Sequence, residues 1–233
     1  MKTEKMLERV HAIAATLPEE PRKEFDYYCK IPGGVPSWAG GLAAELALLM
    51  QDLQHDLNQE AARAGGKLDQ LKAAQRVIKS AEKLQGSKPA LHGVWTADGL
   101  QCFCDGFSGF RLRDPLTLPA IREGLEPLNL AAVINPARDN QTPLELPSVA
   151  ELRALIKTEK ARRKGEGIKT TRPITYDFGE GLPLLDAQRL IDALEVLPGC
   201  VARCSSHRPG VSPVYFESAA GDGIVLPVRR QDQ

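Results

Sequence analysis

The sequence has few aromatic residues, no net charge and no long apolar run. Phe, Trp and Tyr make up 5% of the 233 residues, and 30 Lys and Arg balance 30 Asp and Glu. Any nucleic acid must therefore be met by a local basic face and not by the charge of the whole protein. The longest apolar run, 42–50, is interrupted by Glu45 and is far shorter than the roughly 20 residues of a membrane span. The charged start, MKTEKMLERV, is unlike a signal peptide, so we expect a soluble, cytoplasmic protein.

Recognisable catalytic and metal-binding patterns are also missing. The chain has no G-x-S-x-G, P-loop, G-x-G-x-x-G or H-E-x-x-H pattern, and its four histidines are scattered. The cysteines form two pairs, Cys102 with Cys104 and Cys200 with Cys204, which together with His92 and His207 could in principle form a zinc site. Neither pair has the C-x₂-C spacing that is usual for structural zinc. We therefore favour buried, apolar thiols. We expect no enzyme activity, no catalytic residue, no metal and no cofactor.

The first 65 residues have mostly helical spacing. Apolar residues recur at helical intervals over 2–17 and 42–63, and Gly65-Gly66 ends the second run. Between these runs, 18–41 contains PEEP, IPGGVP and WAGG, which predict an irregular connection. The sequence therefore predicts an all-helical N-terminal extension, 1–65.

A third helical run, 67–84, has an apolar face and a basic face. Four cations fall within about 60° of one another on a helical wheel: Lys72, Arg76, Lys79 and Lys83. The two acids of the run, Asp69 and Glu82, do not lie among them. Such a face is either a solvated exterior or a surface that contacts phosphates.

The apolar period then changes from that of a helix to that of a strand. Residues 91–112 predict two or three short strands, with a hairpin turn at Asp98-Gly99 and a second turn at Asp105-Gly106. A helix is predicted at 186–197, ending at Pro198-Gly199. Further strands are predicted at 130–134, 173–178, 200–206, 213–218 and 223–228.

A second basic segment covers 148–167. Ser148 and Glu151 have the spacing of a capping box, so a helix is expected to begin there and to fray at Gly165. Its cations are Lys157, Lys160, Arg162, Arg163 and Lys164. They form either a second contact to DNA or a solvated, mobile loop.

Two halves of the chain, about 67–147 and 168–230, share one organisation: a helix followed by strands. The second half contains LIDALEVLPG (190–199), SPV (212–214) and LPVR (226–229), and the first contains SKPALHGV (87–94) and DGFSGFRL (105–112). These stretches resemble DNA sliding clamps, above all the C-terminal domain of the bacterial β clamp, best over 182–230 and more weakly over 67–112. The resemblance implies an α+β fold, in which 67–230 form a single clamp-like domain of two pseudo-symmetric helix-plus-antiparallel-sheet units joined by 148–167. A bacterial clamp chain has three such domains, whereas this chain has room for one.

The resemblance also implies a function. By this resemblance the protein would be a non-enzymatic accessory protein of DNA replication that associates with duplex DNA or with a DNA polymerase. The resemblance also allows for an oligomer. The residues expected to contact DNA, without sequence specificity, are Lys72, Arg76, Lys79, Lys83, Lys160, Arg162 and Arg163. A groove for short peptide motifs of a polymerase or another protein would be lined by Val214, Leu226, Pro227, Val228 and Arg229.

Each expectation has an alternative. The predicted helix 186–197 holds three acids, Asp186, Asp192 and Glu195, against the single cation Arg189. That balance favours a protein-interaction module that keeps the clamp fold without binding DNA. The expected groove residues are equally compatible with an ordinary strand buried on one side.

Overall fold

The computed structural model describes residues 2–30, 35, 36, 39–84, 86, 88–168 and 172–230. It has mixed α and β structure, which confirms the predicted α+β class. The chain divides into two compact units, Met1–Leu71 and Lys72–Gln233, and the division falls inside helix α4 (Leu68–Lys83). Among the described residues, no helix combines the length and the apolar character needed to cross a membrane.

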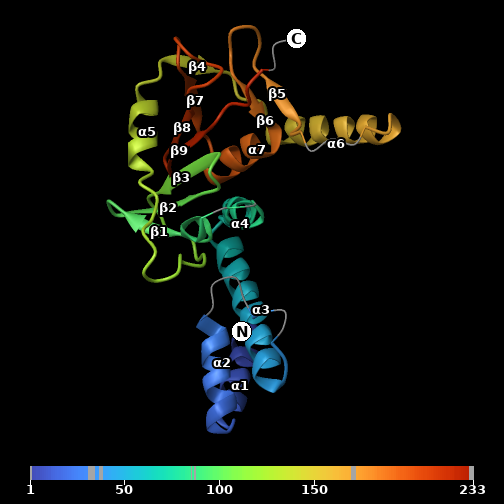
Figure 1. The fold of residues 1–233 in the computed structure, drawn as a ribbon, viewed down its shortest axis with the longest axis vertical. Helices are drawn as coiled ribbons and strands as arrows, with labels where there is room; N and C mark the ends of the chain where they lie inside the picture. The colour runs from blue at the N-terminus through green and yellow to red at the C-terminus, as the bar shows by residue number, and fades with distance from the viewer. Residues whose placement is uncertain are drawn as a thin grey trace. The chain divides into compact units, whose positions relative to one another are not determined.

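The first unit is built from helices α1 (Lys2–Ala15), α2 (Glu19–Lys30) and α3 (Leu42–Ala64). Helices α1 and α2 both pack against α3 (Figure 1). Their shared core contains Val10 of α1, Phe25 and Tyr28 of α2, and Leu46 and Leu53 of α3.

Helix α2 corrects the prediction that 18–41 is irregular throughout. Pro21 argued against a helix in the sequence, yet it is the third residue of α2. The first turn of a helix has no intrahelical acceptors for its N–H groups, so proline costs no hydrogen bond there. Of the remaining predicted connection, 31–34, 37 and 38 lie outside the described residues.

The second unit contains a seven-stranded antiparallel sheet, in the order β1-β2-β3-β9-β8-β7-β4. A short 3₁₀ helix, η1 (Pro89–Leu91), follows α4 and leads to a three-stranded meander of β1 (Trp95–Ala97), β2 (Leu100–Cys104) and β3 (Ser108–Leu112). Helix α7 (Ala187–Val196) precedes a second meander of β7 (Val201–Cys204), β8 (Val214–Ser218) and β9 (Gly221–Val225). The two meanders join where β3 pairs with β9, and β4 (Thr142–Leu144) pairs with β7 at one edge. Strands β5 (Thr175–Asp177) and β6 (Leu184–Asp186) form a separate pair.

The turns of the first meander follow the sequence prediction. Asp98 and Gly99 both have positive φ, 52° and 73°, as a two-residue hairpin with the twist of the flanking strands requires. Gly106, in the second predicted turn, has φ 87°. The side chain of Asp105 holds that turn, because its Oδ1 accepts hydrogen bonds from the N–H groups of Phe107 and Ser108.

Helices cover the two faces of the sheet. Helix α5 (Ala131–Arg138) packs on β8 and β9, and with Leu130 it places Ile134 and Ala137 in a core with Tyr215 and Ile224. Helix α7 contacts β3 and β9, and in Figure 1 it lies on the opposite side of the strands from α5. The predicted strand at 130–134 is therefore wrong, because 131–134 form the first half of helix α5.

Helix α6 (Val149–Gly165) packs on α7. The predicted capping box is confirmed, since Ser148 Oγ accepts from the N–H of Glu151 and the carboxylate of Glu151 accepts from the N–H of Ser148. The basic residues from Lys157 to Lys164 lie on this helix and not in a loop.

Candidate functional site

Helices α4 and α7 are joined by an arginine. Arg76, on α4, donates from Nε to Asp192 Oδ1 at 2.8 Å and from Nη2 to the carboxylate of Glu195. Both acceptor side chains are largely buried. Arg76, predicted to contact DNA, thus binds two acids of α7.

Glu195 also binds an arginine of α6. Arg153 Nη2 lies 2.5 Å from Glu195 Oε1, while Arg76 contacts Oε2 of the same carboxylate. One carboxylate of α7 thus bridges two basic helices. Two of the three acids that argued against a DNA-contacting surface, Asp192 and Glu195, are paired with these arginines.

The four cations of α4 and four of the six on α6 have the same spacing. On each helix they are separated by four, three and four residues, which places them along one side of the helix. We call these rows the α4 stripe (Lys72, Arg76, Lys79, Lys83) and the α6 stripe (Arg153, Lys157, Lys160, Lys164).

Six of the eight side chains in the two stripes are lysines, and all six are exposed. In the part of the chain that the structure describes, none of them forms an ion pair: Lys72, Lys79, Lys83, Lys157, Lys160 and Lys164. The other predicted contacts are occupied, because Arg162 binds Glu159 and Glu166, and Arg163 binds Glu159 and the backbone carbonyl of Arg172. These hydrogen bonds, first from Arg162 and then from Arg163, lower the pKa of Glu159 to about 2.

The side chain of Asp192 is buried to the same extent as that of Glu195. The Asp192 side chain is 8% exposed, and burial raises its pKa to about 6, although the neighbouring Arg76 favours the ionised form. Desolvation outweighs the ion pair because burial removes water from the carboxylate, while Arg76 is shared with Glu195.

Arg189, the cation of α7, is held inside the fold. It binds Asp186 and the buried Asp105, and its guanidinium lies over the ring of Phe107, 4.4 Å from the centroid. Asp186 in turn caps α7 by accepting from the N–H groups of Gln188 and Arg189. Neither residue adds a free charge to the surface between the stripes.

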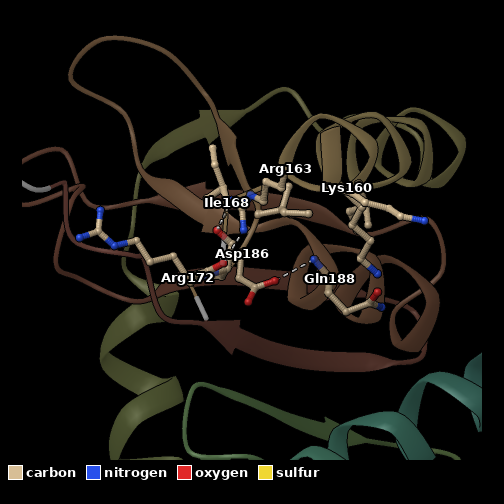
Figure 2. Close-up of a pocket in the computed structure, with 10 residues that line it drawn as sticks. Lys160, Arg163, Ile168, Arg172, Asp186 and Gln188 are labelled. Atoms are coloured by element: carbon tan, nitrogen blue, oxygen red, sulfur yellow. Dashed lines mark hydrogen bonds between the residues drawn. The ribbon is translucent and has the colours of Figure 1, made fainter. Parts of the chain in front are cut away.

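A cleft of about 530 Å³ lies beside the α6 stripe, between α6, the segment before β5 and the start of α7. Figure 2 shows Lys160 and Arg172 on opposite sides of Asp186, with Lys160 on the same side as Gln188. Four cations and four apolar residues line it, with one acid and one amide: Lys160, Arg163, Lys164 and Arg172; Ile156, Ile168, Pro173 and Ile174; Asp186 and Gln188. We call it the α6 cleft.

Of the residues predicted to line a peptide groove, Val214 lies in strand β8 and the other four follow the end of β9. Strand β9 ends at Val225, so Leu226, Pro227, Val228 and Arg229 lie beyond it, and the predicted terminal strand at 223–228 is displaced. Val214 is fully buried in β8, where its neighbour is Val225. The N–H groups of Leu226 and Val228 bind the carbonyls of Phe107 and Leu184, and neither the α6 cleft nor a second cavity beside β4 and β7 is lined by these five residues.

Within the described ranges, no three His, Cys, Asp or Glu side chains gather as metal ligands would. Burial raises the pKa of the thiols of Cys104 and Cys200 to about 11, which keeps both protonated at neutral pH. A protonated thiol is a poor nucleophile and a poor metal ligand.

The sequence interpretation missed Arg153 and Arg172. The spacing of the α6 stripe could have revealed Arg153, but the basic run was read from Lys157 onward. Comparison of the chain with protein-family models, with curated proteins and with solved structures finds no significant match.

Proposed function

We propose that this protein is a non-enzymatic, sliding-clamp-like accessory protein that contacts duplex DNA through phosphates, without reading the base sequence. The observation that carries the proposal is the pair of lysine stripes on α4 and α6, which flank a helix whose acids are already paired. A role beside a DNA polymerase belongs to the same proposal and rests on the clamp resemblance.

Lysine suits this kind of contact. Its ammonium group is a compact, hydrated charge on a flexible stem, so it can meet phosphates that are not fixed in one register. Duplex DNA carries one negative charge for about every 1.7 Å of its axis, and each neutralised phosphate releases counterions. Six exposed lysines can therefore bind DNA in a protein whose net charge is zero.

The order of the strands supports the clamp-like part of the proposal. A helix followed by a three-stranded meander occurs twice, as α4 with β1–β3 and α7 with β7–β9. The last strands of the two meanders pair with each other, and Arg76 links the two helices. This arrangement is what two related helix-plus-sheet units of a clamp domain would produce.

The test is the binding of a fluorescein-labelled duplex, measured by anisotropy over a series of salt concentrations. Replacing Lys72, Lys79 and Lys83 together by Ala should weaken binding roughly tenfold at low salt and reduce the slope of log K against log[salt] by about 2 to 3. Replacing Lys157, Lys160 and Lys164 should have a similar effect, whereas a change in duplex sequence should have little.

The matched control removes three exposed lysines outside the stripes: Lys5, Lys30 and Lys88. If this control weakens binding as much as the α4 variant, the contact is a general charge effect. If the wild-type protein has no measurable affinity at low salt, the proposal is wrong. The alternative, a protein-interaction module without DNA, would then be preferred, and the engagement of Arg76, Arg162 and Arg163 within the protein already favours it.

A further inference from the structure

The α6 cleft carries an excess of positive charge. Lys160, Lys164 and Arg172 line it with a single acid, Asp186, while the fourth cation, Arg163, is already paired with Glu159. That acid is already satisfied by the N–H groups at the start of α7 and by Arg189. An occupant of the cleft must therefore be anionic to complement it, and it cannot rely on Asp186 as a partner.

The uncharged wall of the cleft is aliphatic. Ile156, Ile168, Pro173 and Ile174 line it, and none of its ten lining residues is aromatic. Proteins that hold unpaired bases generally stack them on aromatic rings or arginine planes, and the most enclosed arginine here, Arg163, is bound to Glu159 and to backbone carbonyls. The wall instead matches aliphatic side chains.

The cleft is an open trough and not an enclosed pocket. Every lining residue retains solvent exposure, and six of them are exposed: Lys160, Lys164, Ile168, Arg172, Pro173 and Gln188. A small ligand usually has most of its surface buried by its site. An open trough lined by both cations and aliphatic side chains is better matched by a segment of a protein, which makes several small contacts along its length.

We infer that the α6 cleft binds an acidic peptide segment of a partner protein, with aliphatic side chains against Ile156, Ile168 and Ile174 and carboxylates at Lys160, Lys164 and Arg172. This site is distinct from the groove at Val214 and 226–229 that the clamp resemblance suggests. Because Lys160 and Lys164 also belong to the α6 stripe, a bound acidic segment excludes DNA from α6. That last consequence, unlike the binding itself, rests on the proposed function.

The experiment uses the full chain and a fluorescein-labelled peptide in which leucines alternate with aspartates. Anisotropy should show saturable binding, and either Ile168→Gln or Arg172→Gln should weaken it at least about tenfold, as expected when an anchoring side chain is removed. Two control peptides, with serine for leucine and with asparagine for aspartate, should each bind at least about tenfold more weakly. Leu128→Gln and Arg122→Gln are matched controls at exposed positions away from the cleft and should leave binding unchanged.

The outcomes separate this inference from the proposed function. Ile168→Gln and Arg172→Gln lie outside both lysine stripes, so duplex affinity should survive in them while peptide affinity falls. If the wild-type protein binds the peptide but not the duplex, only the proposed function is refuted. No saturable peptide binding, equal binding of the serine peptide, or preferential binding of single-stranded oligothymidylate would each overturn the inference, and circular dichroism establishes that the variants are folded.

Discussion

A substitution of Asp192 tests which has the larger effect on the free energy of unfolding: the burial of its carboxylate or its ion pair with Arg76. Its pKa rises from 3.8 to about 6 in the folded protein. An acid whose pKa is raised by folding binds its proton more tightly in the folded state than in the unfolded state. Its ionisation therefore destabilises the folded protein. This destabilisation is absent at low pH and grows as the pH rises from 3.8 to about 6. A shift of about 2 units corresponds to about 3 kcal/mol, which sets the scale of the effect.

The perturbation is Asp192→Asn, which removes the titration while Glu195 still binds Arg76. The free energy of unfolding, relative to wild type, should increase by up to about 3 kcal/mol between pH 4 and pH 7. Urea titration at each pH measures it, in a Trp38→Phe background in which Trp95, in β1 of the second unit, is the sole tryptophan.

The comparison with wild type cancels the other titrating groups, and Asp177→Asn provides a control of opposite sign. Arg230 lowers the pKa of Asp177, so that variant should lose stability relative to wild type as pH rises through the ordinary range of Asp. If Asp192→Asn instead loses relative stability as pH rises, or shows no dependence on pH, the ion pair with Arg76 dominates and the assignment of the raised pKa to burial is wrong.

Two further substitutions test the packing of the sheet, by urea unfolding followed through Trp95. Arg111→Met should lower the free energy of unfolding by about 3 kcal/mol, because the buried Asp222 loses its bidentate partner and keeps Arg138 and Tyr215. A loss no larger than that of the exposed Arg113→Met would contradict this. Gly221→Ala should cost about 3 kcal/mol or more, because a Cβ there would lie 2.0 Å from the backbone oxygen of Arg111, whereas Gly210→Ala, with open space around it, should be nearly neutral.

Local chemistry made much of the fold predictable. The turn at Asp98-Gly99 requires two residues that tolerate positive φ, and the capping box of α6 requires only Ser148 and Glu151. Both signals act over a few residues, so neighbouring elements do not change them. They placed the first hairpin and the start of α6 correctly.

Helices α2 and α5 were missed because proline and β-branched residues were weighed by type and not by position. Pro21 lies in the first turn of α2, where it is tolerated. In α5, Val133 and Ile134 suggested a strand, but Leu130, Ile134 and Ala137 follow the spacing of a helix that buries one side against β8 and β9. The burial that decides between these interpretations comes from strands about 80 residues further along the chain.

The candidate site could be predicted only in part for the same reason. The spacing of the lysines on α4 is visible in the sequence, but Arg76 meets Asp192 and Glu195 across 116 and 119 residues. In the sequence alone, these acids argue against a DNA-contacting surface. In the folded unit they pair with Arg76 of the α4 stripe and Arg153 of the α6 stripe, while the six lysines of the stripes form no ion pair with any described residue.

In the ion pairs named above for the second unit, the cation is always arginine. Such a division of roles between arginine and lysine would let a neutral chain carry a basic surface. A guanidinium binds a carboxylate with two hydrogen bonds in a fixed plane, as Arg111 binds Asp222, so arginine is suited to pairing within a fold. Lysine gains less from such pairing and remains hydrated outside. The acids of this unit therefore neutralise its arginines more than its lysines, and the positive charge left over is concentrated on α4 and α6. Net charge alone does not show this, because it counts paired and unpaired groups equally.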